Sequence, residues 1–453
     1  MLMKFLPMLS LSMSSLLLSA CVIVTPDIVV NKDDVIVTSE RPKNIIMIVS
    51  DGMGPAYTTA YRYYADDPAT TQLDNTIFDQ WHIGNASTYP AEVSGLVTDS
   101  AASATALSSG IKSYNGAIGL DANKQPVNTV LHRAKSKGMK TGLAVTSQIV
   151  HATPAAYVAH NESRRNYNEI ADSFFDDRLN GSIKVDVMLG GGTDYFNRED
   201  RDLTDEFVAQ GYQYIDDYGQ LPRLNTKGGA LGLFAPSGLP WALDDTNPTR
   251  LKDMAQTAVR LLENEQGYFL LLEASQVDWA GHGRDINSAM AEMHDLHVML
   301  EWLSEYQQKH PDTLVVMTAD HSTGGLTLGA NGDYRWEPEI LHNIVQSVPS
   351  MIEFIKASAL TPQQRLAYIQ SALQFDLTEE EIQAVFAMDM SAENRPLEAV
   401  IKAFIDRKTN TGWTTWGHTA VDVQVFAIGP GASKFAGHQD NTDIAKSIFE
   451  LLD

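Results

Sequence analysis

Six short apolar runs, separated by helical stretches, constrain the fold of this chain more than any other feature. Most of the runs are nearly all apolar, as strands covered on both faces must be. They span residues 44–50, 141–146, 185–189, 268–272, 313–318 and 423–428. This alternation predicts an α/β fold with a doubly wound, mostly parallel central sheet flanked by helices.

Candidate metal ligands follow several of these predicted strands. Carboxylates and imidazoles bind hard and borderline divalent ions, and open α/β sheets bind ligands at the carboxyl ends of their strands. The side chains that stand at or near such ends are Asp51, His151, Glu273, Asp320 and His321. They can therefore converge on one crevice although they are far apart in the sequence.

The segment VTDSAASATA, residues 97–106, places Ser100 behind an acidic residue at the start of a predicted helix. One interpretation is an ordinary helix cap, because Asp-Ser commonly precedes a helix. The other is a nucleophile, because a helix amino terminus favours a serine alkoxide and binds an incoming anion. The clusters of metal ligands elsewhere in the chain favour the second interpretation.

The spacing of Asp278 and His282 is typical of a zinc site. They are four residues apart, on one helical face or across a tight turn, and one distant histidine completes such a set. His418, in the segment TTWGH, is the natural third ligand. Three protein ligands leave a coordination position open, which is typical of a catalytic zinc site.

A second metal is predicted beside Ser100, with the ligands Asp51, Asp320 and His321. Two divalent ions about 4 Å apart would stabilise the attacking and the leaving oxygen of a phosphoryl displacement. A third set, Asp51, Thr153 and Glu273, offers only oxygen ligands. Oxygen ligands suit magnesium.

Six segments, in order along the chain, resemble the alkaline phosphatase family: DGMG at Asp51, TDSAASATA, HATPAAYVAHNESR, the stretch from Glu273 to His282, TADHSTGGL and WGHT. The resemblance implies the fold of that family and a metal-dependent phosphomonoester hydrolase that releases inorganic phosphate through a phosphoserine at alkaline pH. It implies two zinc ions and one magnesium ion, Ser100 as the nucleophile and Arg164 as the clamp on the phosphoryl oxygens. The implied zinc ligands are Asp278, His282 and His418 at one site and Asp51, Asp320 and His321, with Ser100, at the other. The implied magnesium ligands are Asp51, Thr153 and Glu273.

His151 and Trp279 depart from the best-known bacterial pattern of that family, which has an aspartate and a lysine at these positions. An imidazole in place of a carboxylate removes a negative charge from the oxygen-rich site and can admit another metal. Trp279 cannot supply the charged contact that a lysine makes with phosphate. We expect altered magnesium binding and phosphate retention, with packing beside the site as the alternative role of Trp279.

Residues 1–20 are predicted to be a lipoprotein signal peptide, because Lys4 precedes an apolar stretch and LSAC at residues 18–21 resembles a bacterial lipobox. Cys21, the only cysteine, is the expected lipidation site, and residues 21–40 are the expected tether. The expected location is the bacterial cell envelope, with a lipid anchor in the membrane and the fold facing the periplasm or the cell exterior.

Residues 41–453 are predicted to form one catalytic domain with a helical insertion at about 331–410. Capping boxes that begin at Thr361 and Thr378 predict amphipathic helices over 364–373 and 379–388. The expected role of this insertion is a cap or an oligomer contact. The family resemblance implies that two copies can pair as a homodimer.

The net charge of -24 argues against a nucleic-acid-binding surface, which needs positive patches. Phosphate monoester substrates, the expected partners, must therefore be attracted locally by metals and a few cations. Two alternatives stay open at this point: a phosphodiesterase or sulfatase on the same scaffold, and a catalytically silent lipoprotein that binds phosphate or a partner. The ester that turns over distinguishes them.

Overall fold

The computed structural model describes residues 41–453. The predicted signal peptide, the lipidation site Cys21 and the tether all lie outside the described residues. Within residues 41–453, no helix combines the length and the apolar character that crossing a membrane requires.

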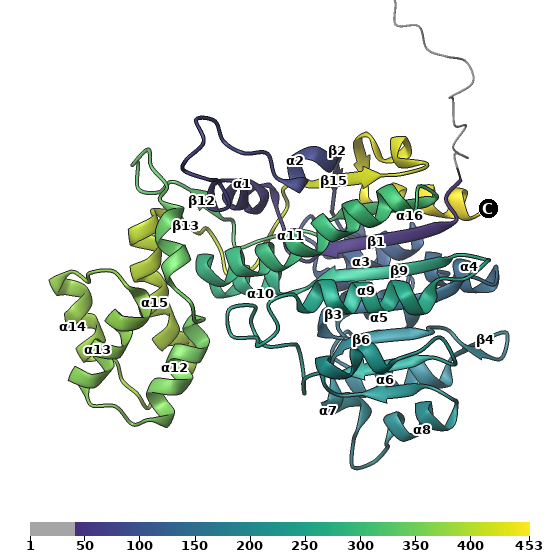
Figure 1. Cartoon of the computed structure of the whole chain (residues 1–453), viewed down its shortest axis with the longest axis horizontal. Helices are drawn as coiled ribbons and strands as arrows, with labels where there is room; N and C mark the ends of the chain where they lie inside the picture. Colours follow the sequence, from purple (N-terminus) through teal and green to yellow (C-terminus); the bar gives the residue numbers. More distant parts are fainter. Residues whose placement is uncertain (1–40) are drawn as a thin grey trace, which may run out of the picture. The chain divides into compact units, whose positions relative to one another are not determined.

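A ten-stranded sheet forms the centre of the described chain, in the order β16-β2-β15-β10-β1-β9-β3-β6-β8-β7 (Figure 1). Only β15 runs antiparallel to its neighbours, β10 and β2, and the other pairs are parallel. The predicted fold class is therefore confirmed. The bounds are β1 Asn44–Ser50, β2 His82–Ser87, β3 Lys140–Gln148, β6 Val187–Gly191, β7 Gln213–Ile215, β8 Ala230–Leu233, β9 Tyr268–Ala274, β10 Thr313–Thr318, β15 Val423–Ile428 and β16 Gly437–Asp440.

All six predicted strands are present, and β1, β10 and β15 have the predicted bounds. Two differences matter for the site: β9 continues to Ala274, so that Glu273 lies inside the strand, and β6 begins two residues later than predicted. Four strands of the sheet, β2, β7, β8 and β16, were not predicted. They are short or contain glycine, and β2 and β16 are partly exposed, so no apolar run marks them.

Helices cover both faces of the sheet. In Figure 1, α9 and α11 lie in front of it, and α3, α4 and α5 lie behind it. The helices of this part are α1 Pro55–Tyr64, α2 Ile77–Trp81, α3 Ser100–Ser109, α4 Val130–Ser136, α5 Ala152–Val158, α6 Tyr167–Asp176, α7 Thr193–Phe196, α8 Leu203–Ala209, α9 Arg250–Leu262, α10 Gln276–Gly283, α11 Ile286–Lys309 and α16 Asn441–Leu452. Short 3-10 helices span Glu92–Ser94, Tyr218–Arg223, Pro338–Asn343 and Ala432–Phe435, and the short strands β4 Arg178–Leu179 and β5 Ser182–Ile183 pair with each other.

The stretch after β12 is helical and lies to one side of the sheet (Figure 1). The chain leaves through β12 Thr327–Leu328 and returns through β13 Thr411–Gly412, which pair with each other. Between them stand α12 Val348–Ala357, α13 Pro362–Leu373, α14 Glu379–Ala387 and α15 Asn394–Thr409. Both predicted capping boxes are formed, by Thr361 with Gln364 and by Thr378 with Glu381, and they start α13 and α14.

Arg250, at the start of α9, is the centre of a buried ion-pair network. Its Nη2 donates to Glu292 Oε2 at 2.7 Å and its Nε to Asp295 Oδ2 at 3.0 Å. It also donates to the backbone oxygen of Pro240 and to Gln276 Oε1, at the start of α10. The network therefore joins the 240–250 loop to α10 and α11, at the carboxyl edge of the sheet.

We predict that Arg250→Met lowers the free energy of unfolding by about 3–5 kcal/mol, because it leaves the carboxylates of Glu292 and Asp295 buried without their cation. Arg335 offers a matched control, since its pairs with Asp333 and Glu337 are exposed. Arg335→Met should cost about 0–1 kcal/mol. Denaturant unfolding of both variants measures the difference, and equal losses would contradict this account of the network.

Candidate active site

The register of the parallel strands brings the predicted ligands to one edge of the sheet. Val49 of β1 is level with Glu273 of β9 on one side and with Thr318 of β10 on the other. Asp51 follows Val49 by two residues, and Asp320 follows Thr318 by two. The structure therefore brings these carboxylates together, as their places after the strands predict.

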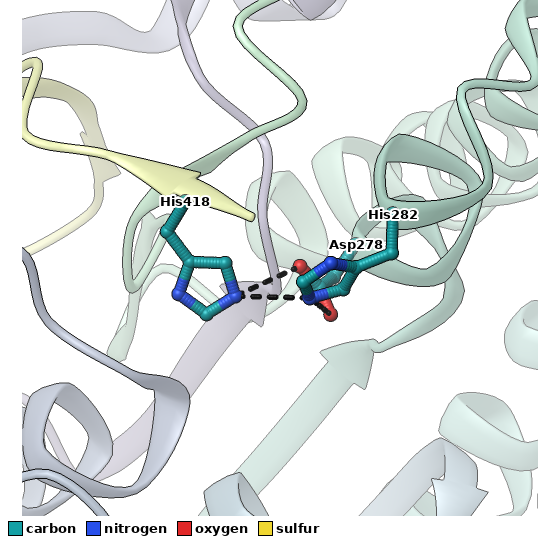
Figure 2. Close-up of side chains that lie close together, drawn as sticks. All are labelled: Asp278, His282 and His418. Atoms are coloured by element: carbon teal, nitrogen blue, oxygen red, sulfur yellow. Dashed lines mark hydrogen bonds and ion pairs between the residues drawn. The ribbon is translucent and has the colours of Figure 1, made fainter. Parts of the chain in front are cut away.

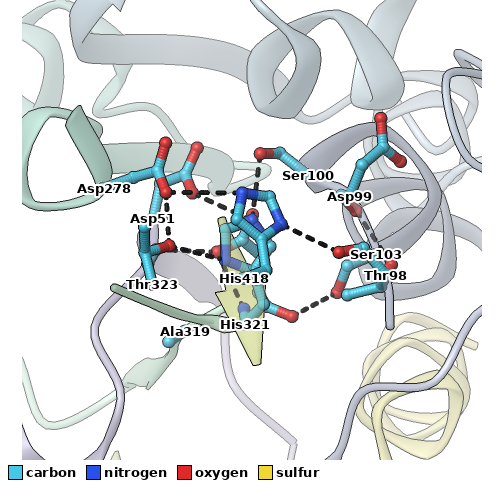
Figure 3. Close-up of polar contacts among 12 residues, drawn as sticks. Asp51, Thr98, Asp99, Ser100, Ser103, Asp278, Ala319, His321, Thr323 and His418 are labelled. Carbon is cyan, nitrogen blue, oxygen red and sulfur yellow. Dashed lines mark hydrogen bonds and ion pairs between the residues drawn. The ribbon is translucent and has the colours of Figure 1, made fainter. Parts of the chain in front are cut away.

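Ser100 is the first residue of α3, and Asp99 caps that helix by accepting from the backbone N–H of Ala102. The Ser100 side chain is buried, and its Oγ lies 3.1 Å from His321 Nε2 (Figure 3). The helix cap is formed by Asp99, and the hydroxyl of Ser100 turns toward the candidate ligands, where a nucleophile would have to lie. The amino terminus of α3 favours negative charge on or beside this oxygen.

Asp278, His282 and His418 form the first cluster, with ligand atoms within 4.8 Å of one another (Figure 2). Nδ1 of His418 donates to the backbone oxygen of Thr98 at 2.8 Å, and Nδ1 of His282 donates to that of Trp416 at 2.5 Å. In neutral rings the Nε2 atoms then carry lone pairs, and these two atoms face each other at 3.0 Å. Burial lowers the pKa of His418 to about 4, which keeps that ring neutral.

Two opposed lone pairs beside a carboxylate form a stable arrangement only around a cation. The Oδ atoms of Asp278 lie 3.5 Å from His282 Nε2 and 3.7 Å from His418 Nε2. Backbone carbonyls that accept from Nδ1 are the usual partners of histidines that bind metal through Nε2. The donor set therefore fits a divalent ion such as zinc.

Asp51, Asp320 and His321 form the second cluster, and all three are fully buried. His321 Nε2 lies 3.1 Å from Asp320 Oδ2 and 3.4 Å from Asp51 Oδ1. Burial and the charges of the neighbouring carboxylates raise the pKa of Asp51 well above its usual value. Among residues 41–453, no group donates a hydrogen bond to either carboxylate oxygen of Asp51, so this cluster also fits a cation.

Gly52 explains the sharp turn that follows Asp51. Its φ of +76° is left-handed, and a Cβ at this position would come within 2.6 Å of the Asp278 Cα. Its backbone N–H donates to Asp320 Oδ1 at 3.0 Å. A glycine is therefore required where the chain passes between the two clusters.

The third cluster contains Asp51, Glu273 and His151, within 4.8 Å of one another. The predicted ligand Thr153 lies two residues beyond His151 in α5, and its Oγ1 is buried. Glu273 is fully buried, and burial and the charge of Asp320 raise its pKa to about 8. The structure thus adds His151 to a set that the sequence predicts as oxygen ligands alone.

Arg164 lies between His151 and Asp99. Its Nη2 lies 3.2 Å from His151 Nε2, and its Nη1 donates to Asp99 Oδ2 at 3.1 Å. Since a guanidinium only donates, His151 Nε2 accepts and Nδ1 carries the ring proton. Burial and the charge of Arg164 lower the pKa of His151 to about 3, so His151 is neutral and brings no charge to the third cluster.

Trp279 stands at the border of the site, edge-on to the His151 ring with the ring centres 5.8 Å apart. On its other side the indole packs on Gly238, where a Cβ would come within 2.3 Å of it. This contact agrees with the packing role that was the alternative for Trp279.

Three partners of the site were not predicted. Thr323 Oγ1 donates to Asp278 Oδ1 at 2.5 Å and lies 3.2 Å from His321 Nδ1, so it joins the first two clusters (Figure 3). Asp99 holds Arg164, and the backbone of Thr98 orients His418. Thr323 lies within the segment TADHSTGGL, two residues after His321, and that proximity was the signal available in the sequence.

Comparisons with known proteins agree on one family. The family model described as alkaline phosphatase matches residues 42–453. Alkaline phosphatase 3 of Bacillus subtilis (strain 168) is 45% identical over 412 residues, which cover 90% of this chain and 89% of that protein. The crystal structure of a cold-active alkaline phosphatase from a psychrophilic Shewanella sp. is 48% identical, covers 90% of this chain and 100% of that one, and superposes with a TM-score of 0.85. A histidine-to-aspartate mutant of the TAB5 alkaline phosphatase, with Mg bound in its M3 site, is 25% identical, covers 91% and 98% of the two chains, and has a TM-score of 0.66.

Removal of metal ions should make the stability of this protein strongly dependent on pH. The raised pKa values of Asp51 and Glu273 mean that the folded, metal-free protein binds more protons than the unfolded chain, and for Glu273 this holds between its usual 4.5 and about 8. The lowered pKa values of the buried histidines His151 and His418 have the opposite effect below their usual 6.5, so stability is expected to fall as pH rises from 6.5 to about 8. Thermal melts in EDTA should show this fall, and melts with zinc and magnesium should show a smaller one.

Glu273→Gln is the matched variant for this experiment, because it removes one of the two titrations and keeps the side-chain shape. Its metal-free melting temperature should change less with pH than that of the unmodified protein. A metal-free melting temperature that rises from pH 6.5 to pH 8 would contradict the electrostatic account of these clusters.

Proposed function

Because this chain belongs to the alkaline phosphatase family and is a hydrolase of phosphomonoesters, we propose that it acts through a phosphoserine formed on Ser100. The observation that supports this choice is the position of the Ser100 hydroxyl. It is buried at the start of α3, 3.1 Å from a nitrogen of His321 and within the ring of candidate metal ligands.

In the proposed reaction, Ser100 Oγ attacks phosphorus, so that the Oγ–P bond forms while the bond from phosphorus to the ester oxygen breaks and the alcohol leaves. Water then breaks the Oγ–P bond and inorganic phosphate is released. The amino terminus of α3 favours negative charge on the Ser100 oxygen, and His321 stands beside that oxygen as a candidate metal ligand. Arg164, which Asp99 and His151 hold in place, binds the free phosphoryl oxygens with its planar fork.

We propose two zinc ions and one magnesium ion as the metals of this site. Asp278, His282 and His418 would hold one zinc, and Asp51, Asp320 and His321 the other. Asp51, Thr153 and Glu273 would hold magnesium beside the neutral His151. Divalent ions act as Lewis acids that stabilise negative charge on the attacking and leaving oxygens. Elemental analysis of the purified protein should find these metals in that ratio.

One further point supports this metal assignment. The raised pKa values of Asp51 and Glu273 mean that these carboxylates become free to bind ions as pH rises. We therefore propose activity at alkaline pH.

We predict that Ser100→Ala lowers kcat by on the order of 10³-fold or more and forms no phosphoserine, because no other hydroxyl replaces the nucleophile. Labelled substrate followed by acid quench and peptide mapping measures the phosphoserine. Ser109→Ala is the control, since Ser109 lies at the other end of α3 and donates only to Thr105. Label on the Ser100→Ala protein would place the nucleophile elsewhere.

Replacement of Arg164 should affect the hydrolysis of monoesters more than the hydrolysis of diesters. A monoester has one more free charged oxygen than a diester, and a guanidinium gains most from the dianion. Arg164→Ser should slow monoester hydrolysis by on the order of tenfold to a hundredfold, and any residual diesterase activity less. The neighbouring exposed residue gives the control, Arg165→Ser, which should alter neither. Equal losses on both esters would show that Arg164 does not contact the free oxygens.

We propose that Cys21 carries a lipid that anchors the protein in the bacterial cell envelope, with the fold facing the periplasm or the cell exterior. The support is the sequence around Cys21 alone. Cys21→Ser should move the protein from the membrane fraction to the soluble fraction. An unchanged distribution would argue for another anchor.

We also propose that two copies pair as a homodimer. Exposed apolar side chains support an interface near α3, because Val93 and Leu96 are each 75% exposed and Val97 and Ile111 are 43% and 44% exposed. Sedimentation of the protein should give twice the mass of one chain. Leu96→Lys should shift it toward the single chain.

A further inference from the structure

A groove of about 520 Å³ opens beside His282, at the edge of the first metal-ligand cluster. Five separate parts of the chain build it: the 240–250 loop, α10, Trp416, and α12 and α15 of the helical stretch. Its walls carry three tryptophans and two cations, Trp241, Trp279, Trp416, Arg395 and Lys402. None of these side chains has a part in the reaction proposed above.

The groove begins where the alcohol of a bound ester would leave. His282 and Trp279 belong both to the groove and to the surroundings of the reacting group, and His282 is held by the backbone of Trp416. A phosphoryl group at Ser100 therefore directs its alcohol toward this opening or toward solvent. The volume is far larger than a small alcohol such as glycerol needs.

The Trp416 ring is held rigidly although it is 40% exposed. The guanidinium groups of Arg284 and Arg395 lie 3.8 Å and 4.6 Å from its ring centre, and Arg284 also donates to the backbone oxygen of Thr415. Such cation–π contacts order an aromatic wall before a ligand arrives. Of these two cations only Arg395 lines the groove, and among residues 41–453 no carboxylate forms an ion pair with it, so its charge stays available to a ligand.

The polar groups of the groove match a planar ring with hydrogen-bonding edges. Lys402 is neutralised by Glu398 at 3.0 Å and by Asp285 at 3.8 Å, so the remaining positive charge of the groove wall comes from Arg395. Indoles and guanidinium planes stack on nucleobases, and a small aliphatic alcohol has no planar face for such stacking. A purely apolar aryl group would offer the guanidinium of Arg395 no hydrogen-bond acceptor.

We propose that this groove binds the nucleoside part of nucleoside monophosphates, with the base against Trp241 and Arg395 and the phosphoryl group at Ser100. This inference rests on the proposed function, because it takes Ser100 as the point of attack. In this proposal, Trp241 and Arg395 determine substrate preference. They take no part in breaking the ester bond.

Adenosine 5′-monophosphate and ribose 5-phosphate give a matched test, because both lose the same primary alcohol oxygen and only the first carries a base. The quantity to measure is the ratio of their kcat/KM values. Trp241→Ala and Arg395→Ala should each lower this ratio by about fivefold to a hundredfold, the range for losing one base-stacking contact. Trp241→Phe should keep most of the ratio, because it keeps an aromatic face.

Tyr334→Ala is the control for removal of a surface aromatic, since Tyr334 is fully exposed on a different loop. It should leave the ratio unchanged. Arg395 is exposed too, so Arg395→Ala tests the groove even if Trp241→Ala fails to fold. As a readout independent of turnover, adenosine should quench tryptophan fluorescence of the unmodified protein and quench that of Trp241→Phe less.

The outcomes separate the two proposals. If both esters are hydrolysed through a phosphoserine and the ratio is the same in all variants, the groove inference is wrong and the proposed function stands. If labelled substrate leaves no phosphoserine on Ser100, the proposed function fails whatever the ratio is. A ratio near one in the unmodified protein would also overturn the groove inference.

Discussion

Concentrated negative charge at one edge of the sheet is the constraint on which the rest of this structure depends. Asp51, Glu273 and Asp320 are fully buried and Asp278 nearly so, and they lie within reach of one another. Buried carboxylates without counter-ions are strongly unfavourable. Such an edge is stable only with cations bound, and only on a scaffold stable enough to hold like charges together.

The apolar sheet supplies that scaffold. β1, β9 and β10 are buried along their whole length, and their parallel register sets the carboxylates level with one another. Helices pack on both faces, so the strands have little freedom to shift and relieve the repulsion. The side chains therefore keep their positions, and burial and the repulsion between the carboxylates raise the pKa values of Asp51 and Glu273.

Around this edge, polar contacts decide which atom each ligand offers. Backbone oxygens hold the Nδ1 atoms of His282 and His418, which turns their Nε2 atoms toward Asp278. Arg164 donates a hydrogen bond to Nε2 of His151, and burial together with the charge of Arg164 keeps that ring neutral. The chemistry of the site thus depends on groups one contact away from the ligands as much as on the ligands themselves.

The sequence by itself determined the fold class, six of the ten strands of the sheet and most of the candidate site. Long apolar strands such as β1 and β10 follow from local composition, and ligands such as Asp51 and Asp320 follow from their places directly after those strands. Partly exposed strands such as β2 carry no such pattern and could not be found this way, because their pairing depends on neighbours far away in the chain.

Only the tertiary structure decided which groups meet across the fold. The groove of Trp241, Trp416 and Arg395 joins segments that share no sequence signal, and the contacts of Arg164 with His151 and of Thr323 with Asp278 do not follow from the motifs that contain these residues. Side-chain contacts of this kind are set by the packing of complete elements against one another. Spacing along the chain reports the periodicity within an element, and it carries no information on which distant elements pack together.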